Sequence, residues 1–429
     1  MFAAVHDWDI VHLDEKRAFL TAKYSSEVPA FAQLKGDPHL YSIIGALYGL
    51  RTSPRDYQDK VVKMCLDLGY TRSQMCRCIY FKKVATSLVI LFHHVDDFIL
   101  TGGKGEVIES EIASLRQYMV TTDPIHDPTA VLGLSIKRDR NRRIISIDVA
   151  DKIADGYKRL SIERMGRDRQ VHVPIPRQAY LISDDDFAKG SPEDAVFLPL
   201  SEIRKYQAIV GFMIWVVGVR YDVSFALLYL SWANCAPRVH HMRYAHYAMN
   251  YLLQHKDLPL VLGGDSSIQV TSFTDASLGT APKGKSVLAG IHRLNQTAGA
   301  IIAKSMKTQS VWLSSFEAEL DGVSQAMKDS SRITNILEEL SIELEGKNTI
   351  FCDNQAVIEF VKGNNNAQKC RHMDLRLFYI RDKLELDRYE LVFMPGAEIP
   401  TDKLTKLAVR EDHEVFTKSV LGLGLLAVN

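Results

Sequence analysis

The sequence has no excess of charge of either sign. Its 429 residues include 52 lysines and arginines and 52 aspartates and glutamates, so the formal net charge is +0 at pH 7. Proteins that bind nucleic acid usually carry a basic excess, whereas this balance is equally that of a neutral enzyme with a small ligand. The overall charge therefore identifies no partner, and only local basic clusters can do so.

Paired cysteine motifs and long apolar segments are also absent. The six cysteines are scattered, without two CxxC pairs or a CxxC with a matching histidine pair, which argues against a zinc site. Without a secretory signal sequence, they are expected to be reduced thiols in an intracellular protein. The longest apolar stretch, residues 208–219, ends at Arg220 and is too short to span a bilayer. We expect a buried helix there and no membrane partner.

The length allows two or three domains, and the N-terminal third mixes α and β patterns. Residues 9–14 form a β-type run that ends at Asp14. In residues 87–103, two apolar runs flank HVDD, which predicts an antiparallel hairpin with Asp96 and Asp97 at or beside its turn. Between these segments, a loop with Gly and Pro leads into apolar spacing that predicts a helix. The apolar positions of this helix are Tyr57, Val61, Val62, Met64 and Cys65.

The middle of the chain changes character twice. Residues 129–160 predict two strands and a helix, and the polar stretch 173–194 resembles a linker. Residues 203–255 fit packed helices with Arg, His and Lys on their polar faces, which predicts a helical connector. After Gly263-Gly264 the predicted order is strand, strand, strand, helix, strand and helix, which is the order of a ribonuclease H fold.

The predicted helix after Ser314 carries an acidic residue beside an apolar stripe. Ser314 and Glu317 fit a capping box. The apolar residues that recur on one face are Phe316, Leu320, Val323 and Met327. Glu319 is so close to this face that its burial would require a cation, a metal or a hydrogen-bond donor. Taken alone, it is more readily explained as a residue at the edge of the stripe that reaches water.

Two further acidic residues follow apolar β-type runs. Asp275 ends SFTD and Asp353 ends IFCD, and a turn is expected to begin directly after each. A lone aspartate at a strand end is commonly a turn residue or a helix cap. In the predicted fold, however, the first and fourth strands are neighbours and the helix of Glu319 packs beside them, so three carboxylates converge. Converging carboxylates raise each other's pKa unless hard cations share the site, and Mg²⁺ is the expected cation.

The same reasoning applies to Asp14 and the Asp96-Asp97 pair. A VDD at a hairpin turn is a weak signal alone because aspartate is common in turns. A third aspartate at the end of a nearby strand strengthens it. Two metal ions about 4 Å apart can activate an attacking oxygen and stabilise a leaving one in phosphoryl transfer. That chemistry serves nucleotide addition and phosphodiester hydrolysis alike.

Together these residues resemble the reverse transcriptase and ribonuclease H segment of copia-type LTR retrotransposon polyproteins. The resemblance covers nearly the whole chain and rests on VHLDEKRAFL, ALYGLRTSPRDY, RCIYF, HVDDFILTG, YDVSFALLYLS, SFTDAS, LSSFEAELDGV, FCDNQAVIEF, RHMDLRLFYIRDKLE and TDKLTKL. It implies an α+β fold, with a right-hand polymerase palm and helical thumb or connector followed by an α/β ribonuclease H-like domain. The implied domains are 1–165, a palm with its fingers largely missing; 166–262, a linker and helical thumb or connection; 263–408, ribonuclease H-like; and 409–429, a C-terminal tail.

The resemblance also implies roles for particular residues. Asp14, Asp96 and Asp97 match the polymerase metal-binding triad, and Phe19 matches the aromatic gate that excludes a ribose 2′-hydroxyl. Gly49, Pro54 and Arg55 lie in the loop that contacts template and incoming nucleotide in the family, although a plain turn and helix start explains them as well. In the second domain, the four-carboxylate set that binds two magnesium ions beside an RNA strand is matched by Asp275, Glu319, Asp353 and Asp402. His372 matches a histidine typical of the family, whereas a lone histidine on an amphipathic helix is more often structural.

The chain departs from the family pattern at several points. His94 replaces the usual tyrosine before VDD, which adds a titratable group there. Ser277 and Leu278 replace the aspartate and tryptophan that follow the first ribonuclease H carboxylate. Family members also carry a fingers segment before the first motif, so we expect an N-terminally truncated polymerase that also lacks the protease, integrase and coat segments.

The expected function is RNA-directed DNA synthesis with degradation of the RNA in the resulting hybrid. The expected cofactor is Mg²⁺, two per site, with Mn²⁺ as the alternative. Expected partners are an RNA template, a DNA primer, an RNA–DNA hybrid, deoxynucleoside triphosphates and other parts of the polyprotein, in cytoplasmic virus-like particles or the nucleus. Two alternatives stay open: only the ribonuclease H unit is active, or the chain is a decayed, inactive nucleic-acid-binding fragment.

Overall fold

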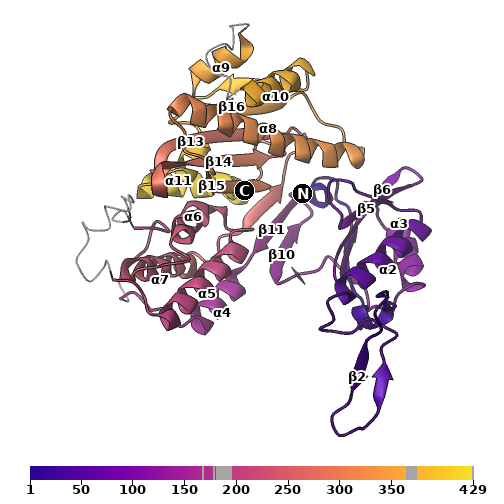
Figure 1. Ribbon diagram of the computed structural model, residues 1–429. Helices are drawn as coiled ribbons and strands as arrows, with labels where there is room; N and C mark the ends of the chain where they lie inside the picture. Colours follow the sequence, from indigo (N-terminus) through magenta and orange to yellow (C-terminus); the bar gives the residue numbers. More distant parts are fainter. Residues whose placement is uncertain (167–168, 177–178, 180–195, 364–373, 428–429) are drawn as a thin grey trace. The chain divides into compact units, whose positions relative to one another are not determined.

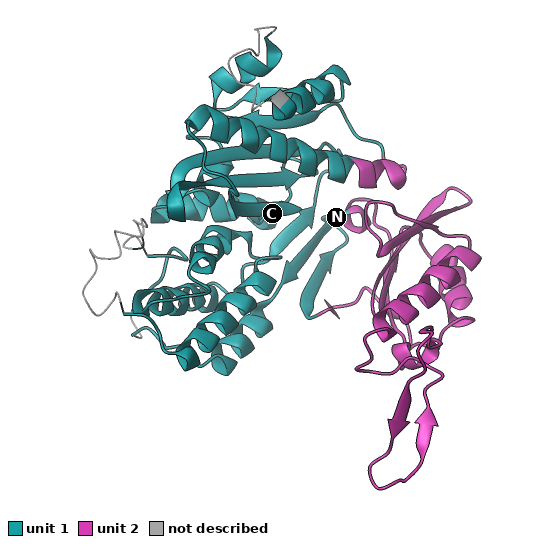
Figure 2. Ribbon diagram, viewed as in Figure 1, with its two compact units in different colours: residues 1, 133–334, 343–429 teal, residues 2–132, 335–342 magenta. Residues whose placement is uncertain are grey.

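A computed structural model describes residues 1–166, 169–176, 179, 196–363 and 374–427 (Figure 1). The chain forms two compact units (Figure 2). The N-terminal unit comprises residues 2–132 and 335–342, and the C-terminal unit comprises residue 1 with 133–334 and 343–429. No helix in the described part of the chain is long and apolar enough to cross a membrane.

The N-terminal unit is built on a six-stranded sheet with the order β4-β5-β6-β7-β1-β8. These strands are β1 (Ile10–Asp14), β4 (Thr71–Arg72), β5 (Ile79–Val84), β6 (Ser87–His94), β7 (Asp97–Thr101) and β8 (Ile125–His126). The other elements are α1 (Phe2–Val5), η1 (Ala18–Thr21), β2 (Phe31–Gln33), β3 (Leu40–Ser42), α2 (Ser53–Asp67), α3 (Glu106–Arg116) and β9 (Ala130–Val131). Because side chains alternate across a strand, Leu91 of β6 and Leu100 of β7 point into the same core as Tyr57 of α2 and Leu115 of α3.

The predictions for the first strand and the hairpin are confirmed. β1 ends at Asp14, and β6 pairs antiparallel with β7. His94 lies opposite Asp97, so Val95 and Asp96 form a two-residue turn. The φ of Val95 is 55°, a left-handed conformation that a β-branched residue rarely adopts. The predicted helix with apolar spacing is α2, and its hydrophobic side faces the sheet.

The C-terminal unit begins with a sheet in which β12, β11 and β10 are adjacent in that order. Its elements up to β12 are β10 (Leu134–Asp139), β11 (Ile144–Asp148), α4 (Ala150–Arg159), α5 (Leu200–Val216), η4 (Tyr221–Val223), α6 (Ser224–Trp232), α7 (Val239–Gln254) and β12 (Leu260–Gly263). The two strands and helix predicted for residues 129–160 are β10, β11 and α4, so that prediction is confirmed. The predicted helical connector is confirmed as α5, α6 and α7.

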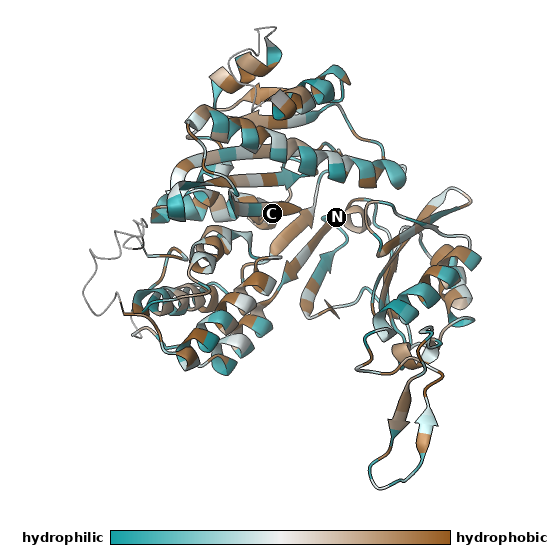
Figure 3. Ribbon diagram, viewed as in Figure 1, coloured by the Kyte–Doolittle hydropathy of each residue, from teal (hydrophilic) through white to brown (hydrophobic). Residues whose placement is uncertain are grey.

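The expectation of a buried helix at residues 208–219 is partly wrong. α5 buries Ile209 and Met213 but leaves Ile214 and Trp215 exposed, at 59% and 41%. The helix is buried on one side only, because α6 and α7 pack against one of its faces. Apolar residues therefore also occur on its exposed side, and the helices of this region show both brown and teal in Figure 3. The predicted linker, 173–194, lies mostly outside the described residues.

A second sheet of the C-terminal unit has the strand order β15-β14-β13-β16-β17. Its strands are β13 (Thr271–Ala281), β14 (Lys285–Arg293), β15 (Ile302–Lys307), β16 (Asn348–Cys352) and β17 (Tyr389–Phe393). The other elements are η5 (Pro282–Gly284), α8 (Ser315–Glu339), α9 (Gln355–Lys362), α10 (Asp374–Glu385), η8 (Pro400–Leu404), α11 (Arg410–Val420) and α12 (Gly424–Ala427). β13 pairs parallel with β16, so the predicted adjacency of the first and fourth strands is confirmed. Leu320 and Val323 of α8 share a core with Ile350 of β16.

The prediction that Asp275 ends its strand is wrong. β13 continues to Ala281, and Asp275 lies within the ladder, opposite Ala289 of β14. The strand runs on because β14 supplies pairing partners as far as Ser277, where the register becomes irregular. Asp353, in contrast, directly follows β16 as predicted.

A buried network around an ion pair joins the connector to α11. The Arg220 guanidinium donates to both oxygens of Asp222, at 2.8 and 2.7 Å, and the Tyr251 hydroxyl of α7 donates to Asp222 at 2.7 Å. His413 of α11 lies 3.0 Å from that hydroxyl. Burial alone would raise the pKa of Asp222, but Arg220 outweighs it and holds this pKa below its ordinary value. The segment 409–429 thus contributes a helix to this core.

Candidate active sites

The first candidate site lies where β1 meets the β6–β7 turn. Asp14, the last residue of β1, is directly opposite Asp97, the first residue of β7. Asp96 is the second residue of the turn, and its carbonyl oxygen accepts a hydrogen bond of 2.8 Å from the Glu15 amide. Residues opposite one another in an antiparallel pair project from the same face, so the Asp14 and Asp97 side chains are neighbours. The structure therefore brings this predicted triad together.

Burial and mutual repulsion determine the electrostatics of the triad. Burial raises the pKa of Asp14, and the Asp96 and Asp97 carboxylates raise it further. The His12 ring and Lys16 oppose this effect. His12 Nε2 lies 2.6 Å from Asp97 Oδ1. One oxygen of Asp97 is thus held by His12, while the other is free of this contact and can bind a metal ion.

His12 and Glu15 are residues of this site that the sequence interpretation missed. His12 could have been found because it precedes Asp14 by two positions and so shares its strand face. Glu15 is buried, with its side chain 1% exposed, and it accepts hydrogen bonds from Lys60 and Tyr57 of α2. No local pattern reveals this contact, because α2 is distant from β1 in the sequence. The ion pair ties the end of β1 to the helix.

The predicted substrate-contacting residues lie in η1, in the loop before α2 and in the first turn of α2. Phe19 of η1 is packed edge-on against the rings of Tyr48 and Tyr57, with centroids 5.1 and 5.8 Å away. Gly49 has a φ of +94° and open space around it, so its turn requires glycine conformational freedom. Pro54 stands in the first turn of α2. Arg55 of α2 is exposed and lies 3.9 Å from Asp59.

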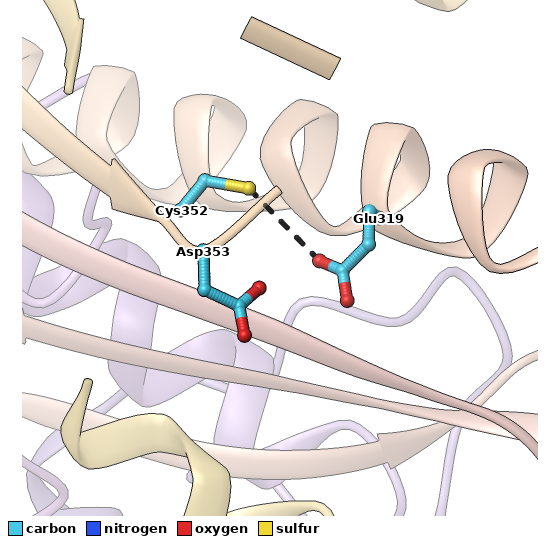
Figure 4. Close-up of side chains that lie close together, drawn as sticks. All are labelled: Glu319, Cys352 and Asp353. Carbon is cyan, nitrogen blue, oxygen red and sulfur yellow. Dashed lines mark hydrogen bonds between the residues drawn. The ribbon is translucent and has the colours of Figure 1, made fainter. Parts of the chain in front are cut away.

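The second candidate site gathers carboxylates from β13, α8 and the end of β16. Glu319 Oε1 accepts a hydrogen bond of 3.2 Å from the amide of Ala276, the residue after Asp275. Glu319 Oε2 lies 4.0 Å from the Cys352 thiol. Figure 4 shows Glu319 directed toward Cys352 and the Asp353 carboxylate. Glu319 is 6% exposed, so its interpretation as a water-reaching residue at the edge of the stripe is wrong.

Burial and mutual repulsion raise the pKa values of the acidic side chains in this second site. Burial raises the pKa of Glu319 to about 9, and the Asp275 and Asp353 carboxylates add to the shift. Burial also raises the pKa of Asp275 and of Asp353, although a hydrogen bond from the Thr405 hydroxyl opposes the shift at Asp275. Burial likewise raises the pKa of the Cys352 thiol, which stays protonated. Carboxylates under this repulsion are good ligands for a divalent cation.

The donor set of the second site fits a hard divalent cation. Ligand atoms of Glu319, Cys352 and Asp353 lie within 4.8 Å of one another. Two of the three are carboxylate oxygens, and Asp275 adds a third carboxylate beside them. Oxygen ligands are those that Mg²⁺ and Mn²⁺ prefer, whereas a protonated thiol is a poor ligand. Glu319 and Asp353, with Asp275, are therefore the residues that would hold a cation.

Asp402, the fourth predicted carboxylate, is engaged by lysines. It lies in η8, which packs against β13 and β14. Lys403 Nζ is 2.8 Å from Asp402 Oδ2, and Lys406 forms an ion pair with Asp402 Oδ1. The sequence interpretation missed Lys406 and Thr405, although both lie in the TDKLTKL motif. His372 lies outside the described residues.

Comparison with known proteins finds a family model that matches the N-terminal region. Residues 1–158 match the family model for reverse transcriptase (RNA-dependent DNA polymerase). Over 90% of this chain and 44% of the other, the fold is similar to the structure of the foamy viral protease-reverse transcriptase in complex with RNA/DNA hybrid, with a TM-score of 0.50 and 12% identity. This similarity concerns the fold alone, and it confirms the predicted α+β class.

Two plant retrotransposon polyproteins are similar along nearly the whole chain. The Retrovirus-related Pol polyprotein from transposon TNT 1-94 of Nicotiana tabacum is 23% identical over 427 residues, 98% of this chain and 31% of that polyprotein. The corresponding polyprotein from transposon RE1 of Arabidopsis thaliana is 22% identical over 433 residues, 97% of this chain and 28% of that polyprotein. The resemblance to copia-type Pol sequences is thus confirmed, and the chain spans less than a third of these relatives.

Proposed function

We propose that this chain is an RNA-directed DNA polymerase, with its polymerase site at Asp14, Asp96 and Asp97. The observation that carries the proposal is the register of β1 and β7, which sets Asp14 opposite Asp97 beside the turn of Asp96. The match of residues 1–158 to the reverse transcriptase family supports it. When bound at this triad, two Mg²⁺ ions would activate the primer 3′-hydroxyl and stabilise the leaving pyrophosphate.

The residues around the triad have separate roles in this proposal. His12 orients Asp97 through its 2.6 Å contact. The ion pair between Glu15 and Lys60 keeps the end of β1 against α2. Phe19 lies beside the position of the sugar and excludes a 2′-hydroxyl, while Gly49, Pro54 and Arg55 contact template and incoming nucleotide. The substrates are an RNA template, a DNA primer and deoxynucleoside triphosphates.

We infer a second activity, hydrolysis of the RNA strand of an RNA–DNA hybrid at the second site. The convergence of Asp275, Glu319 and Asp353 from three separate elements carries this inference. The foamy viral enzyme of similar fold is described in complex with an RNA/DNA hybrid, and we propose the same class of ligand here. Phosphate contacts and helix shape would dominate such binding. The assignments of His372, the polyprotein partners, the domain boundaries and the particle or nuclear location stay predictions.

A pair of assays with purified protein and Mg²⁺ tests both activities. Primer extension on an RNA template should be abolished by Asp96→Asn and unaffected by Asp353→Asn, and cleavage of a labelled hybrid should show the reverse. Asp67→Asn and Asp387→Asn, exposed aspartates of the N-terminal unit and the C-terminal unit respectively, are matched controls that should change neither. Hybrid cleavage without extension would leave only the ribonuclease activity. A wild-type chain that does neither would leave an inactive fragment.

A further inference from the structure

Asp402 differs from the other three carboxylates of the second site in its partners. Lys403 and Lys406 pair with its two oxygens, and its side chain is 15% exposed. In the described part of the chain, Asp275, Glu319 and Asp353 form no ion pair with a lysine or arginine. Their hydrogen-bond partners there include a hydroxyl and a backbone amide. One carboxylate of the set is thus paired with lysines before a metal binds, and three are not.

The two lysines differ in their freedom to move. Lys403 also pairs with Asp412 of α11, at 2.9 Å, so two carboxylates hold it. Asp402 is the one ion-pair partner of Lys406 in the described structure, and the Lys406 side chain is 47% exposed. The charge of Lys406 also acts on Asp275, Glu319 and Asp353. The Lys406 ammonium group therefore lies near all four carboxylates and can move away from them into solvent.

The charges around the site favour binding of the two cations one after the other. If all groups are ionised, these four carboxylates and Asp412 against two lysines leave a formal charge of −3. A first divalent cation at Glu319 and Asp353 reduces it to −1. A second cation would bring the charge to +1 and would compete with Lys406 for Asp402. The second cation therefore enters a site that is less negative than the one the first cation enters, and it must also displace Lys406.

We propose that Lys406 is the resident counter-cation of Asp402 and that a second divalent cation binds there only when Lys406 is displaced. The proposal rests on the proposed ribonuclease function for the identity of the cation. Lys406 acts through Asp402 and is a positioning residue. The second site then binds two Mg²⁺ ions one after the other. The second ion binds more weakly, and its affinity depends on Lys406.

Calorimetric titration of the full chain with Mg²⁺ alone, repeated with Mn²⁺, tests the proposal. Lys406→Met keeps the length of the side chain and removes its charge, so it should strengthen the second step by roughly tenfold or more. Asp402→Asn should abolish that step, and adding Lys406→Met in this background should not restore it. Lys304→Met is the matched control, because Lys304 forms a 2.5 Å pair with Asp329 instead, and it should leave the isotherm unchanged.

An isotherm of Lys406→Met that superimposes on that of wild type overturns the proposal. If Lys406→Met does not fold, Lys406→Arg decides the question. A guanidinium holds a carboxylate more firmly than an ammonium does, so this variant should weaken the second step, and a strengthened step refutes the inference. These titrations contain no nucleic acid. A chain that binds cations as described but cuts no hybrid would contradict the proposed activity and leave the role of Lys406 intact.

Discussion

Glu319→Gln should stabilise the metal-free protein at neutral pH while abolishing hybrid cleavage. The pKa of Glu319 is about 9 in the folded chain, against an ordinary value of 4.5. Below pH 4.5 the folded and unfolded states both hold the proton, so the group contributes no difference. Between these two pKa values the unfolded state ionises and the folded state keeps its proton, so folding loses about 1.4 kcal/mol per pH unit. At pH 7 the accumulated cost is about 3 kcal/mol.

Glutamine has nearly the same shape and cannot ionise, so the substitution removes this cost. Unfolding in EDTA should show the variant equal to wild type near pH 4.5 and increasingly more stable up to pH 9. Added Mg²⁺ should make the wild type the more stable of the two, because it binds the folded wild type, whereas the variant lacks one of the metal ligands. Glu385→Gln, at an exposed position of α10, should show no such pH dependence. A variant that is less stable than wild type at pH 7 in EDTA would refute the reasoning.

Three further substitutions test other parts of the structure. Asp222→Asn leaves the Arg220 guanidinium buried without its counter-charge, so it should lower the free energy of unfolding by about 3–5 kcal/mol. An unchanged midpoint in urea unfolding would contradict the network described. Lys60→Met leaves the Glu15 carboxylate buried without a cation, so it should lower the free energy of unfolding by about 3 kcal/mol and reduce primer extension. An unaltered melting temperature would show that the ion pair is dispensable. Gly396→Ala places a Cβ 2.9 Å from Asp353 Oδ2, so Mg²⁺ affinity and hybrid cleavage should fall together by roughly tenfold. An unaltered Mg²⁺ binding isotherm would mean that the loop of Gly396 moves aside.

The sequence was sufficient wherever local patterns decide the structure. Alternating apolar residues predicted β1 and the β6–β7 hairpin, and with them the placement of Asp14, Asp96 and Asp97. Helical spacing predicted α2 and the connector helices. Motif resemblance then predicted the fold class and the Pol relatives, which were confirmed. The strands, the hairpin and the helices depend on residues a few positions apart, so the sequence alone predicts them.

Tertiary structure decided the features that depend on pairing between distant segments. β13 extends past Asp275 because β14 supplies a ladder there, which no turn signal in SFTDAS reveals. Glu319 is buried because α8 packs with the β16 core, although the helix sequence alone fits an exposed edge equally well.

The partners of the site carboxylates likewise depend on the fold. Glu15 meets Lys60 only because α2 packs beside η1, which follows β1, and the Thr405 hydroxyl reaches Asp275 because η8 packs against β13. The sequence by itself therefore determined which residues carry charge at the two sites. The fold determined which charges are buried and which cations accompany them, because contact and burial arise only when distant segments meet.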